Sequence, residues 1–155
     1  MYNPTIQENV APAEYWRERD NEFRYQFYLR NSKLLPFLNN EITHDQMDRY
    51  KERFMGMNRV MLVMDELDET LVPRETSFFQ EFDFNGNVTA YKETDLYKMD
   101  AIGLKTMQEN GQIERYLIKG GGHIANSKTC QQLYQIPFLY GDLEHQDEQV
   151  LVDCL

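Results

Sequence analysis

The sequence predicts an α/β fold in which helices and strands alternate. Val60–Met64 is a short, unbroken apolar run, which is typical of a strand buried on both faces of a parallel sheet. Arg115–Ile118 reads as a second strand. Apolar side chains recur near the helical period in Thr43–Arg59 and in Asp95–Glu109, so we expect one helix before the first strand and another between the two strands. The length of 155 residues suits a single domain.

The chain before the first strand divides into three parts. Residues 1–12 contain two prolines and read as irregular. Residues 13–30 mix aromatic, basic and acidic side chains. Aromatic and basic side chains together can stack on single-stranded bases, but the interleaved acids argue against this, so we expect a packed surface segment or lid. Thr43–Arg59 is predicted to be helical because Thr43 and Gln46 have the spacing of a capping box.

Between the two strands we expect a hairpin and then a helix. Asn85-Gly86 is a strong turn signal between two extended runs, and it predicts a β-hairpin over Phe78–Lys92. Thr94 is suited to cap the helix predicted over Asp95–Glu109.

After the second strand the sequence predicts a last helix and an acidic end. Thr129–Tyr140 reads as a helix that Pro137 strains or ends. Residues 141–155 are acidic, and we expect them to fray. Cys130 and Cys154 could pair, but two cysteines make neither a disulfide framework nor a metal-binding pattern.

Composition excludes several classes of partner. The net charge of −10 opposes a phosphate backbone, so we expect no nucleic acid partner. No apolar run approaches the length of a transmembrane segment. The first eight residues lack the basic start and apolar core of a signal peptide. A hydrophobic content of 41% argues against a disordered chain.

The ends of the two predicted strands carry side chains suited to proton transfer. An acidic loop with Asp65, Glu66, Asp68 and Glu69 follows the first strand, and three glycines and then His123 follow the second. An acid before a histidine is the chain order of an α/β-hydrolase triad. Taken alone, the second stretch favours a glycine-rich turn with an incidental histidine, and the acidic loop upstream is what makes a catalytic role worth considering.

A series of short motifs along the chain carries a family likeness. They are Ala13-Glu-Tyr-Trp16, Tyr28-Leu-Arg-Asn-Ser32, Asp68-Glu-Thr-Leu-Val-Pro73, Glu93-Thr-Asp-Leu-Tyr97, Gly103-Leu-Lys-Thr-Met107, Asn110-Gly-Gln112, Gly121-Gly-His-Ile124 and Gln135-Ile-Pro-Phe-Leu139. In this order they resemble the palmitoyl-protein thioesterases. The likeness covers roughly residues 2–141.

The resemblance implies a partial α/β-hydrolase fold, made of the last sheet strands, the crossover helices and part of the lid. It also implies a lysosomal or secreted enzyme that removes S-linked fatty acyl groups from cysteines of proteins or peptides, without a metal or cofactor. Carried over by motif, Asp68 would be the triad acid and His123 the general base. Asp65 is the rival acid, but it lacks the matching distance to Pro73.

The chain departs from this family at the nucleophile. The serine belongs upstream in a Gly-x-Ser-x-Gly motif, which this sequence lacks, and its three serines lie elsewhere (Ser32, Ser77 and Ser127). We therefore expect residues 1–141 to be the carboxyl-terminal part of one hydrolase domain, without its early strands and nucleophile elbow, followed by an acidic tail over 142–155. Such a fragment should be inactive alone, and its uncovered sheet edge should favour aggregation.

Two other functions stay open. The chain could be an inactive truncated form that binds acyl chains or partner proteins. A cysteine hydrolase using Cys130 with His123 has less support, because no catalytic signature surrounds Cys130, and a buried small apolar residue fits that position better. Asn87-Val88-Thr89 is a glycosylation sequon, which matters only if the chain is secreted.

Overall fold

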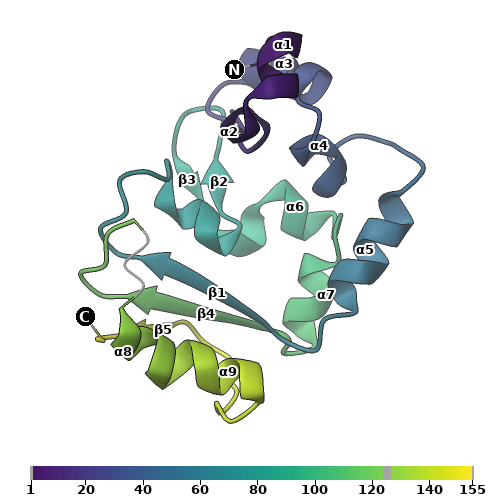
Figure 1. Cartoon of the computed structure of the whole chain (residues 1–155). Coiled ribbons are helices and arrows are strands. Elements are labelled where there is room, and N and C mark those ends of the chain that lie inside the picture. Colours follow the sequence, from purple (N-terminus) through teal and green to yellow (C-terminus); the bar gives the residue numbers. More distant parts are fainter. Residues whose placement is uncertain (1, 124–126, 155) are drawn as a thin grey trace. The chain divides into compact units, whose positions relative to one another are not determined.

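The computed structural model describes residues 2–123 and 127–154 and shows a mixed α/β chain (Figure 1). The α/β class predicted from the sequence is therefore confirmed. The chain divides into two compact units, each built from two stretches of sequence. Residues 2–57 and 81–106 form the helical unit, and residues 58–80 and 107–154 form the sheet unit.

A parallel three-stranded sheet is the centre of the sheet unit. β1 (Val60–Asp65) pairs with β4 (Ile113–Ile118), and β4 pairs with β5 (Val150–Val152). The first and last residues of β1 lie opposite the first and last residues of β4. Both predicted strands are therefore confirmed, and the loops that follow them leave the sheet at the same edge.

The C-terminal segment contributes the third strand, β5. Its three residues lie opposite the last three of β4, and Val152 is buried. Further along the sheet, the backbone N–H of Gln146 donates to the buried carboxylate of Glu114. The expectation that residues 141–155 fray is therefore wrong for this strand, because the apolar Val-Leu-Val run pairs with β4 despite its acidic surroundings. The assignment of residues 1–141 to part of one hydrolase domain stays a prediction.

A helical segment packs against one face of this sheet. It consists of α8 (Lys128–Cys130), the π turn η3 (Gln131–Gln135) and α9 (Ile136–Tyr140). The predicted helix is present, but it continues past Pro137 and ends at Gly141, which has a φ of 76°. Proline lacks an N–H and crowds the preceding turn, and the wider π turn lies directly before it.

The core of the sheet unit lies between the sheet and this helical segment. Its buried members are Tyr116, Ile118, Cys130, Val152 and Cys154. A disulfide joins Cys130 to Cys154, so the pairing that the sequence left open is present. The interpretation of Cys130 as a catalytic nucleophile is therefore wrong, because its sulfur is not a free thiol.

The helical unit begins with four short helices. They are α1 (Pro4–Asn9), α2 (Ala11–Glu14), α3 (Glu22–Asn31) and α4 (Leu35–Leu38). The expectation of an irregular start is wrong, because the prolines stand in the first turn of α1 and α2. In a first turn the backbone N–H has no intrahelical partner, so proline is tolerated there.

Charged groups pack along one face of α3. The guanidinium of Arg17 lies 2.6 Å from a carboxylate oxygen of Glu41 and 2.7 Å from one of Glu81. Tyr28 of α3 is fully buried and donates a hydrogen bond to Glu41, whereas Phe23 on the same helix is 80% exposed. α3 is therefore packed on one face and open on the other.

The helix before β1 is shorter than predicted. α5 spans Met47–Met55, whereas the prediction covered Thr43–Arg59. The predicted capping box does not form, because the backbone N–H of Gln46 donates to Nδ1 of His44 instead. Such local hydrogen bonds compete with helical structure, and here they delay the helix start.

The predicted hairpin is present with short strands. β2 (Glu81–Phe82) pairs with β3 (Val88–Thr89) in antiparallel fashion. The Asp83 carboxylate accepts backbone N–H groups of the turn, and Gly86 has a φ of 81°, which explains the Asn-Gly turn signal. Short 3₁₀ turns precede and follow it in sequence, η1 over Arg74–Phe78 and η2 over Tyr91–Glu93.

The single helix predicted over Asp95–Glu109 is two helices, α6 (Asp95–Lys98) and α7 (Leu104–Glu109). Thr94 caps α6 as predicted. Asp100 separates the two helices, with a φ of 50°, and its carboxylate accepts the backbone N–H groups of two residues in α7. Asp100 therefore starts a second helix within the stretch whose apolar spacing predicted one continuous helix.

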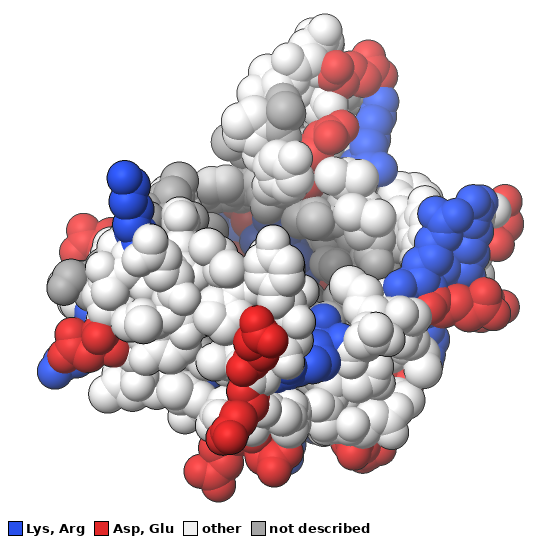
Figure 2. Space-filling model, turned by 60° about the horizontal axis from the view of Figure 1, so that its bottom comes forward, with Lys and Arg blue, Asp and Glu red and all other residues white. Residues whose placement is uncertain are grey.

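Two surface features bear on partners. On the face seen in Figure 2, the described Lys and Arg side chains lie in separate groups, each with Asp or Glu side chains nearby. The absence of a nucleic acid partner stays a prediction that rests on net charge. Across residues 2–123 and 127–154, every helix is too short or too polar to cross a membrane.

Candidate active site

The loops after β1 and β4 are hydrogen-bonded to each other at the carboxyl ends of these strands. The backbone N–H of Glu66 donates to the carbonyl of Ile118 at 2.9 Å, and that of Leu67 donates to the carbonyl of Gly121 at 2.7 Å. In return, the backbone N–H of Gly120 donates to the Glu66 carboxylate at 2.7 Å. The register of the sheet and these three bonds fix the two loops relative to each other.

These loops bring Asp68 and His123 into contact. Oδ2 of Asp68 lies 2.9 Å from Nδ1 of His123. The Asp68 side chain is 5% exposed, whereas that of His123 is 38% exposed. Within the part of the chain that the structure describes, Nε2 of His123 makes no hydrogen bond. The histidine therefore has one ring nitrogen held by a buried carboxylate and the other without a hydrogen bond to any described residue.

The surroundings of Asp68 favour its ionised form. Its second oxygen, Oδ1, accepts the backbone N–H groups of Thr70 at 2.8 Å and Leu71 at 3.2 Å. Burial raises the pKa of Asp68, but the hydrogen bonds from His123, Leu71 and Thr70 outweigh it, so the pKa lies below its ordinary value. Asp68 is therefore a charged acceptor with a fixed orientation.

The glycines before His123 allow the two loops to approach closely. A Cβ on Gly121 would lie 2.3 Å from Oδ1 of Asp65 and 3.1 Å from a methyl of Ile118. Gly120 has a φ of 71°, which side chains rarely adopt. A Cβ on Gly122 would meet nothing within 4 Å. Two of the three glycines thus have a specific steric role.

Asp65, the rival acid, lies beside this pair but does not bond to His123. Its Oδ1 is buried without a hydrogen-bond partner among the described residues. Burial and the charge of Asp68 raise the pKa of Asp65, against a smaller opposite effect of His123. The hydrogen-bond geometry therefore favours Asp68 over Asp65 as the partner of the histidine.

The three serines make no hydrogen bond to His123 in the described part of the chain. Ser32 is buried after α3, and Ser77 lies within η1. Ser127 caps α8 and donates to the carbonyl of Cys154. The described residues also contain no group of three His, Cys, Asp or Glu side chains that could hold a metal ion.

The arrangement is suited to general base catalysis. A proton on Nδ1 of His123 donates to Asp68, and this tautomer leaves Nε2 free to accept a proton from a nucleophile. The carboxylate also stabilises the imidazolium that forms when Nε2 is protonated. The sequence predicted no role for Glu66 and Gly121 in tying the loops together, because nothing distinguishes Glu66 from the other acids of its loop.

Comparison with known proteins decides the family. The family model described as palmitoyl protein thioesterase matches residues 1–123. The chain therefore belongs to the palmitoyl protein thioesterase family. The match ends at His123, so Asp68 and His123 both lie within the residues that the family model covers.

Relatives in three animals support this membership. Palmitoyl-protein thioesterase 1 of Caenorhabditis elegans is 31% identical over 79% of this chain and 40% of its own length. Lysosomal thioesterase PPT2 homolog of Drosophila melanogaster is 23% identical over 92% of this chain and 48% of its own length. Lysosomal thioesterase PPT2 of Rattus norvegicus is 30% identical over 79% of this chain and 39% of its own length. The chain therefore spans less than half the length of these relatives, and the family resemblance seen in the sequence is confirmed.

Proposed function

We propose that this chain supplies the acid and base of a Ser-His-Asp triad in a palmitoyl-protein thioesterase, which removes S-linked fatty acyl groups from protein cysteines. One observation carries the proposal: the 2.9 Å contact between Asp68 and His123, in a chain of this family. The parallel sheet that displays both residues at one edge is consistent with a partial α/β-hydrolase fold.

In this mechanism His123 accepts one proton and gives it up again in each half of the reaction. Nε2 takes the proton of a serine hydroxyl as the serine oxygen attacks the thioester carbonyl. The C–S bond then breaks, and the imidazolium gives its proton to the cysteine thiolate. In the second half, Nε2 takes a proton from water as the water oxygen attacks the acyl-serine carbonyl. The C–O bond to the serine then breaks, the imidazolium gives its proton to the serine oxygen, and the fatty acid is released. Asp68 holds the tautomer throughout.

The nucleophile and the oxyanion hole are outside this sequence in our proposal. The sequence has no Gly-x-Ser-x-Gly motif, and the relatives are more than twice as long as the regions they share with it. We propose that the 155 residues alone do not hydrolyse thioesters, because none of the three serines lies in the motif that forms the acyl-enzyme.

A chimera tests the proposal. The part of the Caenorhabditis elegans relative that precedes the shared region is joined to this chain, and hydrolysis of an S-palmitoyl peptide is measured. We expect turnover and labelling by a serine-hydrolase probe. His123→Ala should reduce turnover by about 10³-fold or more, and Asp68→Asn by a comparable factor. Glu69→Gln, an exposed acid in the same loop, is the control and should leave turnover unchanged.

Two results would contradict the proposal. An active chimera that His123→Ala does not impair would remove the histidine from the mechanism. Labelling of the unfused 155-residue chain would show that a nucleophile is present after all.

The second candidate is a catalytically inactive form that binds acyl chains or proteins. The open face of α3 favours it, because Phe23, Gln26 and Phe27 line a surface hollow there and Phe23 is 80% exposed. Fluorescence binding of a palmitoyl probe to the unfused chain distinguishes the two. Tight binding that Phe23→Ala abolishes, together with an inactive chimera, would favour the binding function.

We also propose a lysosomal or secreted location. Two of the relatives carry the word lysosomal in their names, and the Cys130–Cys154 disulfide is typical of proteins that fold in an oxidising compartment. Asn87 of the sequon is exposed in the turn after β2. Expression in a secretory system should give a glycosidase-sensitive mass increase that Thr89→Ala removes.

A further inference from the structure

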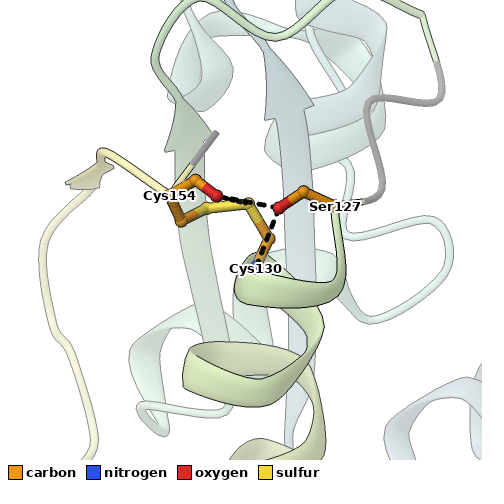
Figure 3. Close-up of a disulfide and its surroundings, with 3 residues drawn as sticks. All are labelled: Ser127, Cys130 and Cys154. Carbon is orange, nitrogen blue, oxygen red and sulfur yellow. Dashed lines mark hydrogen bonds between the residues drawn. A yellow bond between two sulfur atoms is a disulfide. The ribbon is translucent and has the colours of Figure 1, made fainter.

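The C-terminal segment Val150–Cys154 is hydrogen-bonded to the chain on both sides of His123. Four residues before the histidine, the backbone N–H of Lys119 donates to the carbonyl of Val152 at 2.8 Å. Four residues after it, the hydroxyl of Ser127 donates to the carbonyl of Cys154 at 2.8 Å (Figure 3). The loop that carries His123 thus begins and ends at contacts with the same short segment.

The contact after His123 is reinforced by a covalent bond. Ser127 accepts the backbone N–H of Cys130 at 3.0 Å, which starts α8, and the same Cys130 is joined to Cys154 by the disulfide (Figure 3). One serine hydroxyl therefore links the helix start to the strand end, and the disulfide holds both in place.

Burial makes this assembly rigid. Cys130 is 2% exposed, Cys154 is 4% exposed and Val152 is 1% exposed. They pack with Tyr116 and Ile118 of β4 in one cluster. A segment held by backbone pairing, a buried cluster and a disulfide opens only at high cost in free energy.

We propose that residues Val150–Cys154 form a C-terminal clamp that positions His123 against Asp68. Ser127 and Cys154 are its positioning residues, since neither touches the Asp68–His123 pair. Val150–Cys154 lie after residues 1–123, which the family model matches. The inference deepens the proposed function and rests on it for the role of His123.

A disulfide makes the clamp sensitive to thiols. A dithiol reductant breaks the Cys130–Cys154 bond, each sulfur gains one electron and one proton, and the dithiol becomes a cyclic disulfide. Among the described residues, the carbonyl of Cys154 then keeps the Ser127 hydroxyl and the weaker contact with Cys130 Sγ, and β5 stays paired with β4, but the covalent link is gone. We expect His123 to be held less firmly against Asp68 on reduction.

Nuclear magnetic resonance of the 155-residue chain tests the clamp without any activity. The readouts are the low-field Nδ1–H signal of His123, which reports its bond to Asp68, and hydrogen exchange at Gly120 and Gly121. In Cys130→Ser/Cys154→Ser we expect the signal to broaden beyond detection and exchange to accelerate at least about tenfold. Leu151→Ala is the control, because this β5 side chain is 60% exposed and its loss keeps the backbone pairing.

A milder variant decides the matter if the double variant does not fold. Ser127→Ala keeps the disulfide and removes two hydrogen bonds, and we expect exchange at the two glycines to accelerate about three- to tenfold. Unchanged signals in Ser127→Ala would overturn the clamp, as would equal effects of Leu151→Ala. Alkylation of both cysteines in denatured, unreduced protein would also overturn the clamp, because it would show that the disulfide is not formed.

These readouts separate the two proposals. The clamp is tested by the hydrogen bond and exchange of the chain itself, which need no nucleophile. The thioesterase proposal is tested by turnover of the chimera, so either can fail while the other stands.

Discussion

Two aspartates three residues apart have opposite effects on stability. The folded state lowers the pKa of Asp68, through hydrogen bonds that outweigh burial, and raises that of Asp65, through burial and the charge of Asp68. The ordinary value for both is 3.8. One carboxylate is thus stabilised when charged, and its neighbour is destabilised when charged.

Asp68→Asn should lower the free energy of unfolding at neutral pH. Because the pKa is lowered on folding, the stabilisation by Asp68 is present above the unfolded value and is lost as pH falls through the folded value. The difference in unfolding free energy between the parent and the variant should therefore narrow as the pH is lowered below about 4. Urea unfolding of both proteins at a series of pH values measures this difference. A gap that does not change with pH would contradict this origin.

Asp65→Asn should raise the free energy of unfolding at neutral pH. Because the pKa of Asp65 is raised, ionisation costs stability as the pH rises from the unfolded value through the folded one. The variant should be more stable than the parent at neutral pH and equal to it in acid. The same urea series checks this, and a variant that is less stable at neutral pH would show that Asp65 has an attractive partner.

Gly121→Ala should separate the two loops. The added Cβ would lie 2.3 Å from Oδ1 of Asp65, so we expect a loss of about 1 to 3 kcal/mol in unfolding free energy and a weaker His123–Asp68 bond. Gly122→Ala is the matched control, because its Cβ would have open space. Asp65→Ala should rescue Gly121→Ala in a double-mutant cycle. Equal losses for both glycines would indicate a backbone effect instead.

At the scale of elements, the sequence predicted the strands best. β1 begins with the continuous apolar run Val60–Met64, and β4 ends with Tyr116–Ile118 shortly before the glycines. The prediction failed where a local polar contact overrode periodicity: His44 delays α5, and Asp100 divides the helix over Asp95–Glu109. It also failed for β5, since three apolar residues in an acidic tail gain their structure only from β4.

The candidate site was predicted through motif likeness more than through physical reasoning. Spacing alone left the histidine as an incidental turn residue and gave four acids in one loop. The structure brings Asp68 rather than Asp65 to His123 because its side chain is oriented by Thr70 and Leu71 N–H groups. No pattern in the sequence encodes that orientation.

Asp100→Ala should weaken the start of α7. The carboxylate accepts the backbone N–H groups of Lys105 and Thr106, and alanine also tolerates a φ of 50° poorly. We expect a loss of about 1 to 2 kcal/mol in unfolding free energy. Asp100→Asn keeps an acceptor and tolerates this backbone, so it should lose less. Equal losses would show that the charge, paired with Lys51, is what matters.

At the scale of the whole molecule, the open edge of β1 should govern solution behaviour. Among the described residues, no strand pairs with β1 on the side away from β4. The N–H groups of Val60 and Glu66 point to the β4 side, so alternation along the strand turns the N–H of Val63 to the open edge. Exposed edges pair with other chains. We therefore expect the purified chain to self-associate as its concentration rises.

Val63→Pro tests this origin of the association. Proline removes the outward N–H and blocks an added strand while sparing the bonds to β4, as edge strands allow. Leu62→Pro removes a bond to β4 and should unfold the sheet unit instead. Sedimentation velocity over a concentration series should show association in the parent and less in Val63→Pro. A parent that stays monomeric at all concentrations would contradict an open edge of β1 as a pairing surface in solution.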